Sequence, residues 1–321
     1  MPLSPTPAFI TPMAARVVDQ LPEGDDWIYE VKFDGYRALL IKNGGRVQIR
    51  SRNDRDLTAT YPSVAAAARR LGADRAVVDG EVVAVDATGH PSFQALQPRP
   101  AYPGHAIVFY AFDLLHLDGV DLIASPLEAR RAKLQRVLDD SGVMFSAELP
   151  GSAEQVIAAV RGLGLEGVIA KRARSRYVAG ERSDAWVKLK LDKQQEFVVG
   201  GYRPGPHGVD ALLVGYYAGR DLLFAGKVRA GFTPHVRRDV HALLRPLHAG
   251  RCPFANLPEA RSSRWGGGVT AEQMPEMTWV APKLVVQVRF VEWTGDSHLR
   301  HAAFLGVRQD KEPRNVVREQ P

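Results

Sequence analysis

The sequence predicts an α+β protein of two domains, with antiparallel sheets and helices in the first domain and a small β-barrel in the second. Its 321 residues are enough for two ordinary domains, and 45% of them are hydrophobic, which allows each domain a core of its own. Apolar runs typical of strands alternate with helical segments up to residue 190. A polar stretch at residues 191–195 then precedes a new series of strands. We therefore expect domains at residues 1–193 and 194–321.

The stretch Glu30–Arg37, with the sequence EVKFDGYR, organises the first domain. Apolar residues on both sides predict two strands that meet at Asp34-Gly35, so Lys32 would end the first strand. Lys32 is a candidate nucleophile. An amine is nucleophilic only when it is neutral, so a catalytic lysine must be buried or placed among cations that lower its pKa. Arg37 has the forked shape that suits a phosphate oxygen, and Gly35 permits a close backbone approach. A single lysine near a turn is more often a surface residue, so other motifs must support this role.

Hairpin signals, capping residues and apolar runs predict the other elements of the first domain. Asn43-Gly44-Gly45 separates two alternating segments, which is typical of a hairpin. Helices are expected at residues 62–71, 125–140 and 152–163, and capping boxes that begin at Ser125 and Ser152 would start the last two. Strands are expected at residues 27–32, 38–41, 47–50, 76–85, 107–115, 164–172 and 186–190. We expect the segment 76–85 to form two short strands around Asp79-Gly80.

A glutamate and two lysines lie on strands where their charges need partners. Glu81 stands among valines, so its carboxylate requires a salt bridge, a ribose hydroxyl or a metal ion. Lys188 and Lys190 alternate along one strand and therefore share a face. Two such lysines usually belong to a solvated edge. If their face instead lines the pocket of Lys32, they would hold an α-phosphate and lower the pKa of the nucleophile.

Three further residues are candidates for contacts with a nucleotide or a phosphate. Phe112 lies in a strongly apolar run, where an aromatic is more often part of the core, but its place beside Asp113 favours stacking on a base. Arg52 belongs to a polar cluster at a strand end, which suits either ordinary loop chemistry or a phosphate contact. Glu166 comes directly before an apolar strand.

The second domain is expected to contain about five strands, which fits a small OB-type barrel, a fold that commonly binds nucleic acid. The predicted segments include strands at residues 196–202, 211–217, 222–229 and 284–293, a helix at 234–247 and an irregular loop at 251–275. Residues 194–321 hold 17 Lys and Arg against 12 Asp and Glu, compared with 25 against 24 in residues 1–193. This basic excess suits a polyanion, although an arginine-rich composition alone would give the same count.

Two further features narrow the class of protein. No apolar run approaches the ~20 residues needed to span a membrane, and the N-terminal residues lack the pattern of a signal peptide. We therefore expect a soluble, intracellular protein that makes no membrane contact. The single cysteine, Cys252, excludes a disulfide within the chain and makes a zinc site built on thiolates implausible.

Taken in order, the motifs of the chain are KxDGxR, DGE, FYAFD, EGVIAKR, WVKLK and a terminal RxDK. This series, from about residue 9 to 311, resembles the covalent nucleotidyltransferase superfamily. Within it, the chain is most similar to ATP-dependent DNA ligases of the bacterial end-joining kind, the ligase portion of ligase D. The resemblance implies a nucleotidyltransferase (ATP-grasp-like) domain at residues 1–193, an OB-fold domain at residues 194–321, and a hinge near residues 191–196.

The resemblance also gives the candidates of the first motif their roles. Lys32 is similar to the lysine that becomes lysyl-AMP, in a catalytic motif that includes Asp34. Glu30 is similar to the acid that contacts adenine, and Phe112 to the aromatic that stacks on the base. Arg37 and Arg52 resemble the residues that contact the 5′-phosphate side of the nick.

The later motifs receive phosphate-binding and metal-binding roles. Glu81 and Glu166 resemble the carboxylates that contact the ribose and a metal ion, and Lys188 and Lys190 resemble the lysines that hold the α-phosphate. A final group resembles the C-terminal motif that closes over the triphosphate and orients pyrophosphate as the leaving group. Its members are Arg308, Asp310 and Lys311.

The activity implied by this resemblance is the joining of a 3′-hydroxyl to a 5′-phosphate through lysyl-AMP and DNA-adenylate. ATP would be the AMP donor, with Mg²⁺ or Mn²⁺. The implied partners are nicked or broken duplex DNA and end-joining proteins, for a monomer in the bacterial cytoplasm at the nucleoid. The printed sequence holds no polymerase or phosphoesterase module, so we expect its two core domains alone to grip the duplex.

Two other functions share some of these features. An RNA guanylyltransferase or RNA ligase has the same lysine motif and two-domain plan, and would differ in the nucleotide transferred and in the nucleic acid joined. A non-catalytic nucleic-acid clamp would keep the fold without turnover. The presence of Lys32, Glu166, Lys188 and Lys190 argues against the clamp, which would not need all four.

Overall fold

The computed structural model describes residues 7–96, 104–191, 193–259 and 268–319. It divides into two compact units, Met1–Leu191 and Asp192–Gln320. The predicted boundary between residues 193 and 194 lies two residues further along the chain. No helix among the described residues is long and apolar enough to cross a membrane.

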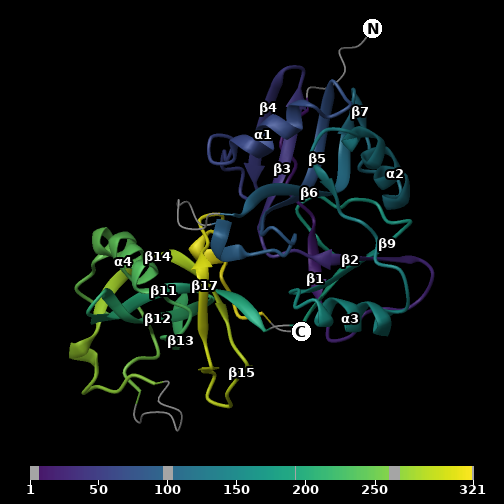
Figure 1. The fold of residues 1–321 in the computed structure, drawn as a ribbon. Coiled ribbons are helices and arrows are strands. Elements are labelled where there is room, and N and C mark those ends of the chain that lie inside the picture. The colour runs from purple at the N-terminus through teal and green to yellow at the C-terminus, as the bar shows by residue number, and fades with distance from the viewer. Residues whose placement is uncertain (1–6, 97–103, 192, 260–267, 320–321) are drawn as a thin grey trace. The chain divides into compact units, whose positions relative to one another are not determined.

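The first sheet of unit 1 has four strands in the order β1-β10-β9-β2. The strands are β1 (Ala14–Val17), β10 (Arg182–Lys190), β9 (Gly167–Arg172) and β2 (Trp27–Lys32). β9 runs antiparallel to both of its neighbours, while β1 and β10 are parallel. One face of this sheet packs its apolar side chains, including those of Tyr29, Val168 and Leu189, against helix α3 (Ala153–Gly162) (Figure 1).

The second sheet of unit 1 has six strands, built on the path β4-β3-β5-β6-β7 with β8 added beside β6. Their bounds are β4 (Arg46–Ser51), β3 (Tyr36–Asn43), β5 (Arg75–Val85), β6 (Ala106–Leu117), β7 (Val120–Asp121) and β8 (Met144–Phe145). Helices α1 (Pro62–Arg69) and α2 (Leu127–Leu138) pack on this sheet, and η1 (Phe93–Leu96) follows β5. Ile28 and Trp186 of the first sheet share one apolar cluster with Leu39 and Leu115 of the second. The two sheets therefore face each other across a common interior.

Two local predictions for this unit were wrong. Residues 76–85 form one continuous strand, β5, whose pairing with β6 shifts register near Asp79 and Gly80 instead of breaking there. Ser125 does not cap α2; the backbone N–H groups of Leu127 and Glu128 donate to the carbonyls of residues 175 and 173. In contrast, the predicted capping box of Ser152 and Gln155 at the start of α3 is confirmed.

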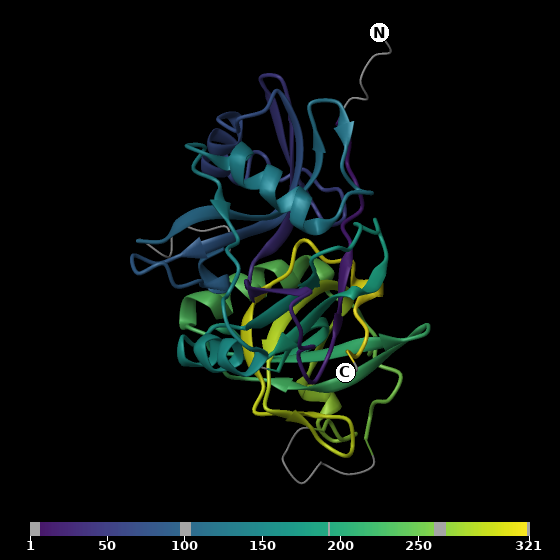
Figure 2. The ribbon, with the colours of Figure 1, turned by 90° about the vertical axis from the view of Figure 1, so that its right-hand side faces the viewer.

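Unit 2 is a five-stranded sheet in the order β13-β12-β11-β14-β17 that closes on itself through a parallel bridge between Ala230 and Ala303. The strands are β11 (Gln194–Gly205), β12 (Gly208–Ala218), β13 (Asp221–Val228), β14 (Thr278–Arg289) and β17 (Ala303–Val307). The shorter elements are α4 (Pro234–Leu244), η2 (Arg245–Leu247), η3 (Met274–Glu276), β15 (Glu292–Trp293), β16 (Leu299–Arg300) and η4 (Pro313–Asn315). Helix α4 lies between the third and fourth long strands in sequence, as expected for an OB-type barrel (Figure 1 and Figure 2).

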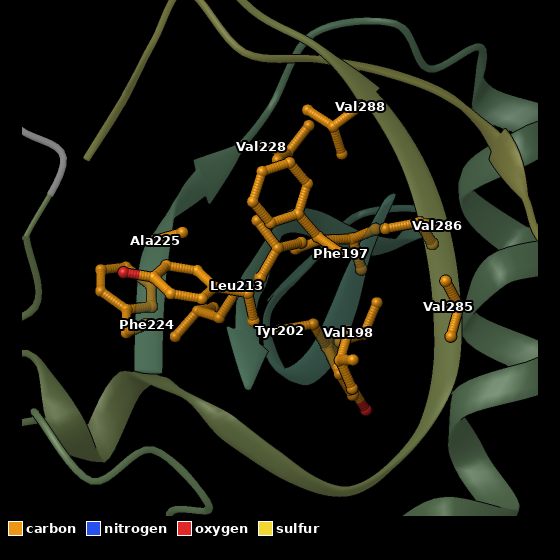
Figure 3. Close-up of a cluster of buried hydrophobic side chains, with 14 of the residues drawn as sticks. Phe197, Val198, Tyr202, Leu213, Phe224, Ala225, Val228, Val285, Val286 and Val288 are labelled. Carbon is orange, nitrogen blue, oxygen red and sulfur yellow. The ribbon is translucent and has the colours of Figure 1, made fainter. Parts of the chain in front are cut away.

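The core of unit 2 is apolar. Strands β11 to β14 direct side chains such as Phe197, Leu213, Phe224 and Val286 toward one another (Figure 3). All four are at most 2% exposed. This barrel therefore has an extensive hydrophobic core of its own.

Candidate active site

One face of the first sheet carries most of the predicted catalytic residues. Lys32 on β2 and Lys190 on β10 both pair with Gly167 on β9, which lies between them. One step along the sheet, Glu30 and Lys188 both pair with Ile169. Because side chains directly opposite each other in a sheet share a face, Lys32, Lys188 and Lys190 lie on the same side. The predicted shared face of the two lysines is confirmed, and it includes Lys32.

The amine of Lys32 forms an ion pair with Glu166, and both side chains are largely buried, at 17% and 6% exposure. Burial lowers the pKa of Lys32, but the charges of Glu166, Asp34 and Glu81 outweigh it, so the net pKa of Lys32 is raised. The prediction of a lowered pKa was therefore wrong. The sequence showed the neighbouring lysines but not how close the carboxylates come.

Gly167 allows β9 and β10 to approach each other closely between Lys32 and Lys190. A Cβ atom at this position would clash with the backbone carbonyl of Leu189 on β10. A side chain here would push β9 and β10 apart, and with them Glu166, whose carbonyl accepts from the N–H of Leu191 at 2.9 Å. The glycine of the EGVIAKR motif is thus required by packing at the centre of the site.

Glu81 of the second sheet lies close to Lys32, and Tyr110 of the same sheet contacts Phe33, the residue after Lys32. Glu81 on β5 pairs with Arg37 on β3 and with Tyr110 on β6. The ring of Tyr110 stacks on Phe33, the residue after Lys32, with centroids 4.0 Å apart and planes inclined by 16°. Phe33 and Tyr110 were not predicted as site residues, although they lie within the KxDGxR and FYAFD motifs. Their pairing depends on the contact between the end of β2 and β6, which is not local in sequence.

Glu30 lies on the same face of the first sheet, in a buried network beside the lysines. Its Oε1 accepts from Arg131 at 2.5 Å and from Lys171 at 2.9 Å, and its Oε2 accepts from Ser146 at 2.7 Å. The side chain is 2% exposed. Both carboxylate oxygens of the residue predicted to contact adenine are therefore already bonded within the protein, and a contact of Glu30 with a base remains a proposal.

Arg37 points into the interior between the two sheets. Its guanidinium donates to both oxygens of Asp79, at 3.0 and 2.6 Å, and Asp79 also accepts from the hydroxyl of Tyr177 at 2.7 Å. This ion pair raises the pKa of Arg37 further above its already high value. In this structure the ion pair of Arg37 joins β3 to β5 within the second sheet, and a contact of Arg37 with a phosphate remains a proposal.

Phe112 is half-buried between cations. The guanidinium of Arg37 lies 5.1 Å from the centre of its ring and the ammonium of Lys171 lies 4.2 Å away. Its edge also contacts Trp186, with centroids 6.1 Å apart. The structure thus places Phe112 in the interior shared by the sheets, and stacking of its ring on a base remains a proposal.

Arg52 and the C-terminal motif complete the set of predicted residues. Arg52 is exposed in the turn after β4, and its N–H donates to the carbonyl of Arg37 at 3.1 Å. In unit 2, Arg308 donates to both oxygens of Asp310, at 2.9 and 2.8 Å, and both residues are buried. Nζ of Lys311 lies 2.8 Å from Oε1 of Glu196. The motif is thus anchored within its own unit.

The carboxylates near Lys32 suit a hard divalent cation. Among the described residues, no group of three or more His, Cys, Asp and Glu side chains could alone enclose a metal ion. Mg²⁺ usually takes only one or two carboxylates and completes its shell with water and substrate phosphates. Glu81 and Glu166 therefore fit such an ion together with a triphosphate.

Comparison with known families identifies both units. The ATP dependent DNA ligase domain matches residues 11–190, and the ATP dependent DNA ligase C terminal region matches residues 205–311. A solved structure of mycobacterial DNA ligase D complexed with ATP and MES is 37% identical, with a TM-score of 0.71 over 97% of this chain and 98% of that chain. The predicted fold class, a nucleotidyltransferase domain followed by an OB-fold region, is confirmed.

Two full-length proteins from bacteria are similar in sequence to this chain over most of its length. The multifunctional non-homologous end joining protein LigD of Pseudomonas aeruginosa is 39% identical over 329 residues, which cover 99% of this chain and 38% of that protein. DNA ligase C2 of Mycolicibacterium smegmatis is 33% identical over 334 residues, or 96% of this chain and 93% of that protein. The chain spans less than half the length of the LigD relatives. It belongs to the ATP-dependent DNA ligase family.

Proposed function

We propose that the protein uses ATP to join a 3′-hydroxyl to a 5′-phosphate in broken duplex DNA, through lysyl-AMP and DNA-adenylate. The observation that carries this proposal is the shared face of Lys32, Lys188 and Lys190, with Glu166 paired to the first lysine. A surface edge would leave these groups in solvent, whereas Lys32 and Glu166 are largely buried. This arrangement suits the transfer of a phosphoryl group to an amine.

In the first transfer, Nζ of Lys32 forms a bond to the α-phosphorus of ATP while the bond to the pyrophosphate oxygen breaks. Lys32 must first lose a proton, and the carboxylates of Glu166, Asp34 and Glu81 raise the pKa of this amine. The adjacent carboxylate of Glu166 is the group placed to receive it. Lys188 and Lys190 would bind the non-bridging oxygens of the α-phosphate, and their charges would favour the neutral form of Lys32.

Glu81 and Glu166 would hold Mg²⁺ or Mn²⁺ with the triphosphate. When bound, such an ion neutralises negative charge on the phosphates. Glu166 would then serve two partners, because the carboxylate that pairs with Lys32 here is also a candidate metal ligand. A triphosphate and its metal ion would thus weaken the ion pair that keeps Lys32 protonated.

The remaining transfers take place on DNA. An oxygen of the 5′-phosphate at the break displaces Lys32 from AMP, and the 3′-hydroxyl then displaces AMP and completes the phosphodiester. Arg52 and the excess of basic residues after residue 193 would contact the DNA backbone, so binding should weaken steeply with salt. The LigD relatives are named for non-homologous end joining, so we extend the proposal to end joining, with end-joining proteins as partners. We further propose that the protein acts as a monomer at the bacterial nucleoid.

The test is to incubate the protein with α-labelled ATP or GTP and a divalent metal, and to measure label on the denatured chain. We expect label from ATP, its loss in Lys32→Ala, and its transfer into sealed product when nicked DNA is added. Protein that is already adenylated is first discharged with pyrophosphate. Label from GTP would indicate capping chemistry instead, and retention of ATP label by Lys32→Ala would contradict the assignment of the nucleophile.

A further inference from the structure

The residues after Lys32 carry the chain from the first sheet of unit 1 to the second. Lys32 is the last residue of β2, and its pairing with Gly167 ends the ladder to β9. Tyr36 then begins β3 in the second sheet and pairs with Val82 on β5. The connection between the sheets is therefore short, residues 33–35, and it starts directly at the nucleophile of the proposed reaction.

Both ends of this connection are fixed to the second sheet, but by different contacts. At its far end, Gly35 lies so close to β5 that a Cβ atom there would stand 2.2 Å from the carbonyl oxygen of Val82. At its near end, the ring of Phe33 stacks on that of Tyr110 on β6, with centroids 4.0 Å apart. Phe33 is bonded directly to Lys32, so this stack restrains the residue next to the nucleophile.

Tyr110 also has a fixed place relative to Glu81. The two residues pair across β6 and β5, so their side chains share a face of the second sheet. Glu81 is held from both sides, because β5 pairs with β3 as well as with β6. The charge of Glu81 raises the pKa of Lys32, as expected for two groups that lie close together. The stack of Phe33 on Tyr110 thus connects the end of β2 to the strand beside Glu81.

We propose that Tyr110, through its stack on Phe33, positions Lys32 for bond formation at the α-phosphorus of ATP. This inference rests on the proposed function. Tyr110 and Phe33 are positioning residues, and neither needs to touch ATP. Without the stack, the connection would keep its anchor at Gly35 but lose the one at the residue bonded to Lys32. Glu81 would stay in place, because both neighbouring strands hold it.

A displaced Lys32 would not affect all three transfers equally. Nζ of Lys32 forms a bond to phosphorus when lysyl-AMP is made, and the same bond breaks when AMP passes to the 5′-phosphate of DNA. In the final transfer the 3′-hydroxyl displaces AMP from DNA-adenylate, and no bond to Lys32 is made or broken. Loss of the stack should therefore slow the first two transfers and leave the third nearly unchanged.

The experiment measures three single-turnover rates in the full chain: formation of lysyl-AMP, its discharge onto a nick, and sealing of a nick that already carries AMP. The variants are Tyr110→Ala and Phe33→Ala, with Tyr110→Phe as the conservative replacement that keeps the ring. Phe232→Ala is the matched control, because Phe232 stacks on Phe304 in unit 2 at the same inclination of 16°. Melting temperature and hydrogen exchange of residues 33–36 are measured on each variant.

Tyr110→Ala is expected to lower the maximal rate of lysyl-AMP formation about tenfold, because small displacements of a positioned group cost rate steeply. The ATP concentration at half-maximal rate should change little. Discharge onto DNA should slow to a similar degree, while sealing should change less than about twofold. Tyr110→Phe should keep all three rates within about twofold, because it preserves the stack. The double variant with Phe33→Ala should be little slower than either single variant, because each alone removes the stack.

Equal slowing of all three transfers by Tyr110→Ala would indicate a general loss of structure and would overturn the inference. An unchanged rate of lysyl-AMP formation despite faster exchange in residues 33–36 would do the same. So would an equal loss in Tyr110→Phe or in the control Phe232→Ala. These outcomes are distinct from failure of the proposed function, which would appear as absence of lysyl-AMP in the unaltered protein.

Discussion

The interiors of the two units differ in the kinds of side chain that they bury. Between the sheets of unit 1 lie buried ion pairs, of which Arg130 with Asp113 is completely enclosed and Arg37 with Asp79 nearly so. The core of unit 2 shown in Figure 3 is aliphatic and aromatic. Burial of apolar side chains stabilises the fold whatever their orientation. A buried ion pair offsets the cost of its own desolvation only when its hydrogen-bond geometry is good. We therefore expect the stability of unit 1 to depend on the geometry of these ion pairs, and that of unit 2 mainly on buried apolar area.

The largest effect should come from breaking the enclosed pair of unit 1. Asp113 accepts from Arg130 at two positions, both at 2.7 Å. Asp113→Asn would leave the charge of Arg130 buried without its counterion, and we expect the free energy of unfolding of unit 1 to fall by about 3–5 kcal/mol. Hydrogen exchange of the backbone amides in each unit would measure this change. Replacement of both residues by apolar ones of similar size should recover part of the loss, and an undiminished stability of Asp113→Asn would contradict this account.

A comparable variant in unit 2 tests the apolar interior. Leu213 is fully buried in the barrel core. Leu213→Ala removes buried methyl groups and leaves a cavity, with an expected cost of about 2–5 kcal/mol. The loss should appear in hydrogen exchange of unit 2 while unit 1 keeps its protection. If both units lost protection together, the two interiors would not be independent, and the comparison would fail.

The charge of Glu166 can be removed without leaving a cavity, because glutamine has nearly the same size. Glu166→Gln removes the largest charge that raises the pKa of Lys32, while burial, which lowers it, remains. The pKa of Lys32 should therefore fall, and at pH 8–9 its neutral fraction should rise. We expect acetylation of Lys32 by acetic anhydride without ATP to become faster, because only the neutral amine reacts. Exposed Lys133 is the internal reference. A slower reaction of Lys32 would exclude this electrostatic account.

The smallest effects are expected at two helix starts with similar sequences. Ser152 accepts from the N–H of Gln155 and completes a capping box, so Ser152→Ala should cost about 1 kcal/mol in urea denaturation. Ser125 makes no such cap, because carbonyls of the loop after β9 occupy the start of α2. Ser125→Ala should therefore change stability by less than about 0.5 kcal/mol. Equal costs at the two sites would contradict the observed caps.

Much of the site could be predicted because strand alternation is a local property. The spacing of Lys188 and Lys190 was enough to place both on one face, since successive side chains point to opposite sides of any strand. The motif order was enough to select Lys32 and Glu166 as partners of one site. Neither argument could reveal that Glu166 pairs with Lys32 directly, because that contact depends on β9 lying beside β2.

The sequence by itself determined most of the long strands, most of the helices and the lysines that share a face, because these follow from periodicity and turn chemistry. Only the tertiary structure decided what the charges do. Arg37 turns toward Asp79, Glu30 is enclosed by Arg131 and Lys171, and the carboxylate of Glu166 raises the pKa of Lys32. The physical reason is that a charge responds to whatever lies within a few ångströms, and those neighbours come from strands and helices far apart in the chain.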